Sequence, residues 1–258
     1  HKPDLDFQDR EGNTPLHYAV QLETGEAFSL TRIFLEKGAD PNMKNDRNQS
    51  PLHLLCHNQE LRRLDTFHDI VQSMLAHGAR PNATSLTGCT PLHLAIFHHD
   101  LETAVLLIKA DATLHLPWKK VSFLRLLRAL LLTETNSFAL PQPSRWPVHW
   151  KDMGTNEVLA LDMVEDEHEL RHLLSALARP QQCAPTRPWC MHCKSTLGTH
   201  SRAVHCKHCS RLVCGKCATS CLPPKYFPKV FDVLGPCWVC SVCEIVLLSR
   251  LDDAATSD

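Results

Sequence analysis

Three stretches of the chain share one four-residue pattern: Thr14-Pro15-Leu16-His17, Ser50-Pro51-Leu52-His53 and Thr90-Pro91-Leu92-His93. Successive copies begin 36 and 40 residues apart. Serine and threonine are favoured as the residue that caps the start of a helix. Proline suits the first helical position, where its missing N–H costs no hydrogen bond. Each copy therefore predicts the beginning of a helix, and the recurrence predicts a repeat protein.

A second helix in each copy ends at a recurring stop signal. Residues 30–37 and 70–77 run into Gly38 and Gly78, and residues 104–110 run into Asp111. Glycine after a helix supplies the left-handed backbone conformation that ends it, and aspartate is one of the few other residues that tolerate this conformation. The pattern therefore predicts pairs of helices separated by tight turns.

These residues resemble the ankyrin repeat, whose unit is a β-turn and two antiparallel helices over about 33 residues. The resemblance implies a mainly α fold, a helical solenoid over residues 1–179 with three clear repeats. Extra residues lie near 23–29 and 57–66, in turns between helices, where insertions cost little. A degenerate capping repeat is expected at about 153–178, because terminal repeats are usually atypical.

An insertion is expected at about 116–152, between the third repeat and the capping repeat. Residues 121–132 are apolar nearly all round and predict a helix. The part that follows is rich in proline and carries Trp146 and Trp150, which predicts an ordered loop. We expect the insertion to pack on the repeats, and a docking site for a partner is the alternative interpretation.

The ankyrin resemblance implies a protein partner on the concave face of the array, which the hairpin tips and first helices form. It also implies a structural role, with hydrogen bonds between repeats, for the histidines of the shared pattern, His17, His53 and His93. We expect His98 and His99 to be solvated in a turn between helices. Residues 4–9 resemble the hairpin that closes a preceding repeat, so we expect further repeats upstream.

The last quarter of the chain is dominated by four cysteine pairs with two residues between partners, Cys190/Cys193, Cys206/Cys209, Cys214/Cys217 and Cys240/Cys243. Each pair places two thiolates on one tight turn and so supplies half of a tetrahedral zinc site. The chain has 13 cysteines and no recognisable signal peptide, which favours a reducing, cytoplasmic location in which cysteine pairs hold metal. The sequence therefore predicts two bound Zn²⁺ ions. We expect no transmembrane segment, since the longest apolar run, residues 121–132, is short and carries two arginines.

This segment resembles the FYVE zinc finger, a reader of phosphatidylinositol 3-phosphate on endosomal membranes. Twelve residues separate Cys193 from Cys206, four separate Cys209 from Cys214, and the segment closes on Trp238-Val239-Cys240-Ser241-Val242-Cys243. The resemblance implies a FYVE-like finger over residues 183–250, followed by a disordered tail at 251–258.

The same resemblance implies two interleaved zinc sites. One zinc would be held by Cys190, Cys193, Cys214 and Cys217, and the other by Cys206, Cys209, Cys240 and Cys243. Cys237 also forms a pair with Cys240, with two residues between them, so Cys237 in place of Cys243 remains an alternative ligand.

The lipid-reading residues of the FYVE family are only partly present. Arg202, His205 and Lys207 occupy basic positions of its phosphate-binding strand, whereas Ala203 and Val204 replace a basic residue and a histidine. Each lost charge-assisted contact is worth roughly 1.5–3 kcal/mol. We therefore expect weak phosphoinositide binding at best, through Arg202, His205 and Lys207.

Composition narrows the class of function. The chain is 43% hydrophobic and 21% charged with a net charge of −1, which indicates a globular protein and gives no electrostatic argument for a nucleic acid partner. Four thiolates around each zinc would leave no open coordination position for chemistry. The sequence predicts a non-enzymatic adaptor or scaffold. An endosomal tether that binds phosphatidylinositol 3-phosphate is the alternative, and an E3 ubiquitin ligase is a third interpretation that Arg211 and Leu212, at positions where ligands would be needed, argue against.

Overall fold

The structure is a computed structural model of the 258-residue chain. It describes residues 4–22, 24–119, 157–164, 166–184, 187, 189–197 and 203–255. The predicted helix at 121–132 and the tryptophan-containing loop after it lie outside the described residues, as does Arg202.

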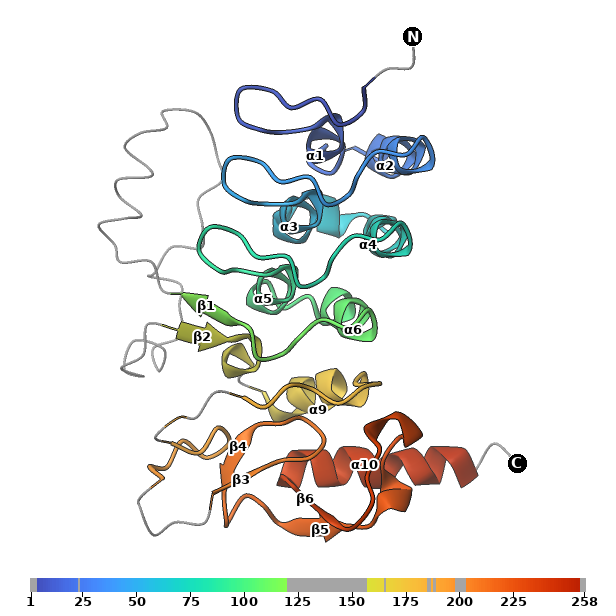
Figure 1. Cartoon of the computed structure of the whole chain (residues 1–258). Coiled ribbons are helices and arrows are strands. Elements are labelled where there is room, and N and C mark those ends of the chain that lie inside the picture. Colours follow the sequence, from blue (N-terminus) through green and yellow to red (C-terminus); the bar gives the residue numbers. More distant parts are fainter. Residues whose placement is uncertain are drawn as a thin grey trace.

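Between residues 4 and 119 the structure describes six α-helices arranged in three pairs. The pairs are α1 (Pro15–Ala19) with α2 (Glu26–Glu36), α3 (Pro51–His57) with α4 (Phe67–Ala76), and α5 (Pro91–Phe97) with α6 (Leu101–Lys109). Figure 1 shows the first helices in one column, the second helices in another, and the connecting loops projecting to one side. A short 3₁₀ helix, η1 (Leu61–Arg63), occupies the extra residues between α3 and α4.

The local signals in the sequence account for where these helices begin and end. Each first helix starts at the proline of the shared pattern, directly after its serine or threonine. Gly38 and Gly78 follow their helices with φ angles of 91° and 85°, and Asp111 does so with a φ of 67°. The predicted left-handed stops are therefore confirmed at all three positions.

A hairpin and two helices continue the stack beyond the third pair, and we refer to this unit as the fourth repeat. Strand β1 (Pro117–Lys119) pairs with β2 (Glu157–Leu159) in an antiparallel hairpin, in which Trp118 lies opposite Val158. The 3₁₀ helix η3 (Ala160–Met163) then takes the place of a first helix, and α9 (Glu167–Ser175) takes the place of a second. The inserted residues thus interrupt the hairpin of the fourth repeat, rather than standing between two complete repeats.

The rest of the chain, residues 183–255, forms a unit that we call the C-terminal module. Its strands form two antiparallel pairs, β3 (Ala203–His205) with β4 (Leu212–Cys214) and β5 (Ser220–Leu222) with β6 (Cys237–Val239). Two 3₁₀ helices, η4 (Pro224–Tyr226) and η5 (Lys229–Phe231), separate β5 from β6. The final helix α10 (Ser241–Ala255) continues past residue 250, so residues 251–255 are helical and the expectation of a disordered tail from 251 was wrong for them.

The repeats and the C-terminal module share one hydrophobic core. A single cluster of buried side chains extends from Leu16 in α1, through Leu107 in α6 and Leu173 in α9, to Leu247 in α10. Figure 1 shows α10 lying directly beneath α9 at the end of the stack. Among the described residues we find no helix with the length and apolar character needed to cross a bilayer.

Candidate metal centres and the array that carries them

Eight cysteines of the C-terminal module gather into two groups of four. Within each group the four sulfur atoms lie within 4.8 Å of one another. The first group contains Cys190, Cys193, Cys214 and Cys217, and the second contains Cys206, Cys209, Cys240 and Cys243. The cysteine pairs alternate between the two groups, which is the interleaved arrangement that the FYVE resemblance implied. Four thiolates converging in this way fit the ligand set of a structural, tetrahedral Zn²⁺ site.

Backbone geometry prepares these sulfurs for a metal. Lys194 and Ser210 directly follow the first two pairs, each with a φ of 60°, and this left-handed residue closes the tight turn. The N–H of Cys214 donates to the sulfur of Cys190, and the N–H of Cys240 donates to the sulfur of Cys206, each over 3.3 Å. Amide donors directed at sulfur favour the thiolate form, which is the form that binds metal.

The first group reaches the protein surface at one corner. Cys193 is exposed, while its three partners are buried. The sulfur of Cys193 lies 3.0 Å from the hydroxyl oxygen of Ser195 and 3.8 Å from the sulfur of Cys214. Hydrogen bonds from the side chain and backbone of Ser195 lower the pKa of Cys193 to about 6.

The second group is enclosed on all sides. All four of its cysteines are buried, and so are Arg211 and His208 beside them. Arg211 directs a guanidinium N–H toward the sulfur of Cys240 over 3.8 Å. Although burial opposes its charge, the nearby thiolates of Cys209 and Cys240 raise the pKa of Arg211. The positive charge of Arg211 therefore offsets part of the negative charge of four buried thiolates.

His208 supplies a second donor to this group. Its Nδ1 lies 3.3 Å from the sulfur of Cys243, and its ring stacks on Phe231 with 5.4 Å between centroids. Burial lowers the pKa of His208 to about 3, so the imidazole is neutral and Nδ1–H can donate to the thiolate. The sequence offered no signal for this role, because His208 stands between the two ligands of a pair.

The remaining cysteines of the chain lie outside both groups. The thiol of Cys237 donates to the carbonyl of Gly235 over 3.3 Å, so it is Cys243 that completes the second group. Cys183 and Cys221 are exposed, whereas Cys56 and Cys89 are buried among the repeats.

The structure places two of the three expected lipid-binding residues at the surface. His205, at the end of β3, and Lys207 are both exposed. His205 Nδ1–H donates to the carbonyl of Ser210 over 3.1 Å, and the backbone N–H of Lys207 donates to the carbonyl of Trp238 over 3.0 Å. Both side chains therefore stand on backbone that is anchored to the second cysteine group.

In the array, the histidines of the shared pattern link one repeat to the next. The Nδ1 atom of His17 accepts from the backbone N–H of Thr14 over 3.0 Å, so its Nε2 carries the proton and donates to the carbonyl of Gln49 over 3.1 Å. His53 repeats this arrangement with the carbonyl of Cys89, and burial lowers its pKa to about 4. The structural role implied for these histidines is confirmed at both positions.

A second set of links runs between the hairpins. The side chain of Asn42 donates to the carbonyl of Gly78 over 2.9 Å and accepts from the N–H of Arg80 over 2.8 Å. Asn82 makes the same two contacts with Asp111 and Thr113 of the next repeat. Asparagine at this position therefore acts as a connector, a role that the sequence analysis missed.

In the fourth repeat, the residues at the histidine position and at the asparagine position bind the C-terminal module instead of another repeat. Asp162 stands where the pattern has its histidine and accepts from the N–H of Leu159 over 3.2 Å. It also forms a buried ion pair with Arg187, 3.3 Å from Oδ2 to Nη1, and its Oδ1 lies 3.7 Å from Nζ of Lys194. His115 stands where the pattern has its asparagine, and its Nε2–H donates to the carbonyl of Cys209 over 2.7 Å. The C-terminal module thus occupies the position of a fifth repeat.

The last helix adds a further connection across this junction. Arg250 of α10 donates to the carbonyls of Ser175 and Leu177 over 2.7 and 3.0 Å. These carbonyls lie at the C-terminal end of α9, where helix carbonyls lack partners within the helix and where positive charge is favourable.

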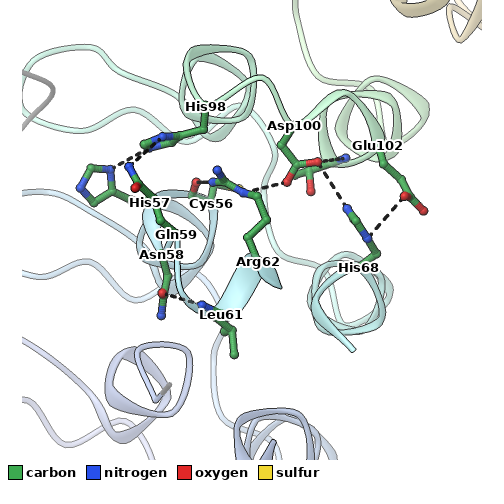
Figure 2. A network of polar contacts seen from close by, with 11 residues as sticks. Cys56, His57, Asn58, Gln59, Leu61, Arg62, His68, His98, Asp100 and Glu102 are labelled. Atoms are coloured by element: carbon green, nitrogen blue, oxygen red, sulfur yellow. Dashed lines mark hydrogen bonds and ion pairs between the residues drawn. The ribbon is translucent and has the colours of Figure 1, made fainter. Parts of the chain in front are cut away.

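A polar network joins the second repeat to the third (Figure 2). Arg62 of η1 donates to the carbonyl of Cys56 over 2.7 Å and pairs with Asp100 over 3.1 Å. Asp100 also accepts from the N–H of Thr103 over 3.0 Å and so caps α6. His68 lies 3.3 Å from the same carboxylate. The extra residues of the second repeat therefore tie that repeat to the start of α6.

The expectation that His98 is solvated was wrong. Its Nε2 lies 3.3 Å from Nδ1 of His57, and Gln59 donates to its Nδ1 (Figure 2). Burial is the main cause that lowers the pKa of His98 to about 3. His99 is exposed, with a φ of 56°, so only this second histidine behaves as a turn residue.

Comparison with known proteins identifies the first part of the chain. Residues 22–116 match the family model described as ankyrin repeats, in three copies. These residues are ankyrin repeats. The C-terminal module lies beyond the matched residues.

Several curated proteins are similar over part of the chain. NF-kappa-B inhibitor alpha from Sus scrofa is 33% identical over 108 residues, which is 42% of this chain and 33% of that protein. The human transient receptor potential cation channel subfamily A member 1 is 27% identical over 132 residues, or 41% of this chain and 12% of the channel. Rabankyrin-5 from Mus musculus is 39% identical over 66 residues, or 23% of this chain and 5% of that protein. The chain thus spans a third or less of the length of each of these relatives.

Proposed function

We propose that the chain is a non-enzymatic adaptor, in which the ankyrin array binds a protein partner and a two-zinc, FYVE-like module forms a second surface at its end. The observation that carries this proposal is the set of contacts between the array and the C-terminal module, which we call the junction. The array's own connectors, at Asp162 and His115, are directed to the module, and one core runs through both parts. Such a rigid arrangement suits a scaffold that presents two surfaces at a set spacing.

Zinc is the metal that fits the two groups best. Sulfur-only ligand sets with tetrahedral geometry are typical of structural zinc, and four thiolates leave no position for a substrate or an activated water. The residues that would hold the ions are the eight cysteines of the two groups. Bound zinc would act as a cross-link in a module whose own apolar core is small.

Elemental analysis of the purified chain tests the metal. We expect two zinc ions per chain, and removal of either group should lower the count by one. A Cys183→Ser variant, which changes an exposed cysteine outside both groups, should keep two. One ion or none in the parent chain would contradict the proposal.

Protein binding by the array can be tested with a photo-crosslinking residue at a defined position. Leu86, on the loop before α5, is 72% exposed, and Ile33, on the outer helix α2, is 46% exposed. We expect a crosslinker at position 86 to capture a protein partner and one at position 33 to capture none. Capture from position 33 alone would contradict binding through the concave, hairpin-lined face.

The endosomal tether is the second candidate, and the exposed positions of His205 and Lys207 favour testing it. We expect liposomes that contain phosphatidylinositol 3-phosphate to bind the chain only weakly, since part of the family's basic strand is replaced. The test compares Arg202→Ala and Lys207→Ala with Lys225→Ala, a control at another exposed lysine. Tight, selective binding that the first two changes abolish and the control preserves would favour the tether and an endosomal location. The third candidate, an E3 ubiquitin ligase, is tested separately. We expect no autoubiquitination with a panel of E2 enzymes, and such activity would favour a ligase instead of an adaptor.

A further inference from the structure

The two cysteine groups differ in how far they are open to solvent. Cys193 makes one corner of the first group exposed, whereas all four cysteines of the second group are buried. An oxidant dissolved in water can therefore reach a sulfur of the first group without any opening of the fold. The oxidant can reach a sulfur of the second group only when the module opens.

The groups also differ in how their negative charge is offset. Four thiolates around one Zn²⁺ carry a net charge of −2. In the second group, the buried Arg211 and the Nδ1–H of His208 are directed at Cys240 and Cys243 over 3.8 and 3.3 Å. Hydrogen bonds and a nearby positive charge make these thiolates less nucleophilic, since their electron density is already shared with donors.

The positive charge beside the first group is placed differently. Lys194 directly follows Cys193, but its side chain is 44% exposed and its nearest described partner is Asp162, 3.7 Å away. The donors at the exposed sulfur are instead neutral groups of Ser195, its hydroxyl over 3.0 Å and its backbone N–H. Cys193 therefore combines access to solvent with a weaker donor than the second group has.

We propose that Cys193 makes the first group an oxidant-sensitive zinc site, which peroxide opens with release of one zinc ion while the second group keeps its zinc. This inference rests on the proposed binding of two zinc ions. The class of reactant is a small, uncharged peroxide such as hydrogen peroxide.

The chemistry balances within the first group. The Cys193 thiolate attacks one oxygen of hydrogen peroxide, the O–O bond breaks, and a sulfenic acid forms with loss of hydroxide. The Cys214 thiolate, 3.8 Å away, then attacks the sulfur of Cys193 and expels a second hydroxide as the S–S bond forms. Two thiolates lose two electrons and one peroxide gains them. The zinc ion loses two of its four ligands and dissociates.

The test treats the purified, zinc-loaded full chain with increasing hydrogen peroxide and follows released zinc with a chromogenic chelator. Native mass spectrometry counts the zinc that remains, and peptide mapping locates disulfides. We expect one zinc to be released at least ten times faster than the other, together with a disulfide between Cys193 and Cys214. A count of fewer than two ions before oxidation would instead refute the proposed zinc binding.

Two variants sharpen the test. Cys193→His keeps a ligand set that zinc accepts but removes the reactive thiol, so we expect two bound ions and release at least ten times slower. Cys221→Ser changes an exposed cysteine outside both groups and should leave release unchanged. Simultaneous loss of both ions, disulfides formed first in the second group, or equal release from Cys193→His and the parent chain would each overturn the proposal. If Cys193→His does not load two ions, the disulfide map of the parent chain decides the matter.

Discussion

At the scale of single residues, a different residue at one position of the shared pattern changes the partner that this position binds. His17 and His53 each donate to a carbonyl of the next repeat, whereas Asp162 at the equivalent position faces Arg187. A carboxylate cannot donate a hydrogen bond to a carbonyl, so aspartate at this position needs a donor as its partner, and Arg187 provides a charged one. The change from histidine to aspartate thus marks the place where the repeats end and the module begins.

Arg187→Met should be strongly destabilising. The Arg187 and Asp162 side chains are 5% and 2% exposed, and removing one partner of a buried ion pair costs about 3–5 kcal/mol. The Asp162 carboxylate would keep only the partly exposed Lys194, 3.7 Å away, as a positive partner. The matched control is Arg179→Met, which breaks an ion pair with Asp111 that is 66% and 51% exposed and should cost less than about 1 kcal/mol. Urea unfolding of the full chain measures both, and equal effects would argue against a buried pair at the junction.

At the scale of elements, the extra residues of the second repeat are a structural connection. The 3₁₀ helix η1 directs Arg62 to Asp100, and Asp100 caps α6 in the next repeat. Without η1, the Asp100 carboxylate, 5% exposed, would lie buried without its arginine. The insertion therefore adds contacts between repeats rather than only lengthening a surface turn.

Asp100→Ala should lower the free energy of unfolding by about 2–4 kcal/mol. The change removes a helix cap, worth about 1 kcal/mol, and leaves Arg62, whose side chain is 17% exposed, without its carboxylate. Glu102→Ala removes a 69%-exposed carboxylate 3.5 Å from His68 and serves as the control, with an expected loss below about 1 kcal/mol. Thermal and urea unfolding followed by circular dichroism measure the two variants. A loss of similar size in both would mean that the network contributes little.

At the scale of the whole molecule, the C-terminal module acts as the end cap of the stack. Repeat arrays gain stability from contacts between neighbouring units, and an uncapped end exposes the apolar face of its last unit. Here α10 covers α9, and Arg250 binds the carbonyls at the end of α9. The fold of the module is therefore coupled to the stability of the adjacent repeats.

Removing zinc with a chelator should loosen the nearest repeats most. We expect faster hydrogen exchange in α9, which lies next to the module, a smaller increase in α6, which packs on α9, and little change in α1 and α2 at the far end. The physical reason is that coupling in a repeat stack passes between neighbours and weakens with each interface. Exchange mass spectrometry before and after chelation, with zinc added back as the control, measures this gradient. Unchanged protection of α9 would show that the module is not the cap.

The sequence alone determined the features that depend on neighbouring residues. The start of each first helix follows from serine or threonine before proline, and each stop at Gly38, Gly78 and Asp111 follows from which residues tolerate a positive φ. The two cysteine groups likewise depend on short turns and on spacing that the FYVE resemblance could interpret. These signals are local, because backbone geometry within a few residues restricts which amino acids fit.

Only the tertiary structure decided which distant groups meet. The contacts of His115 with Cys209, of Asp162 with Arg187 and of His98 with His57 join residues 94, 25 and 41 positions apart. No spacing rule within one repeat predicts such partners, since each depends on how whole units stack. The same holds for Arg211 and His208, which become buried beside the second cysteine group when distant segments of the chain fold around it. Local geometry thus specified the units, and packing between them specified the junction.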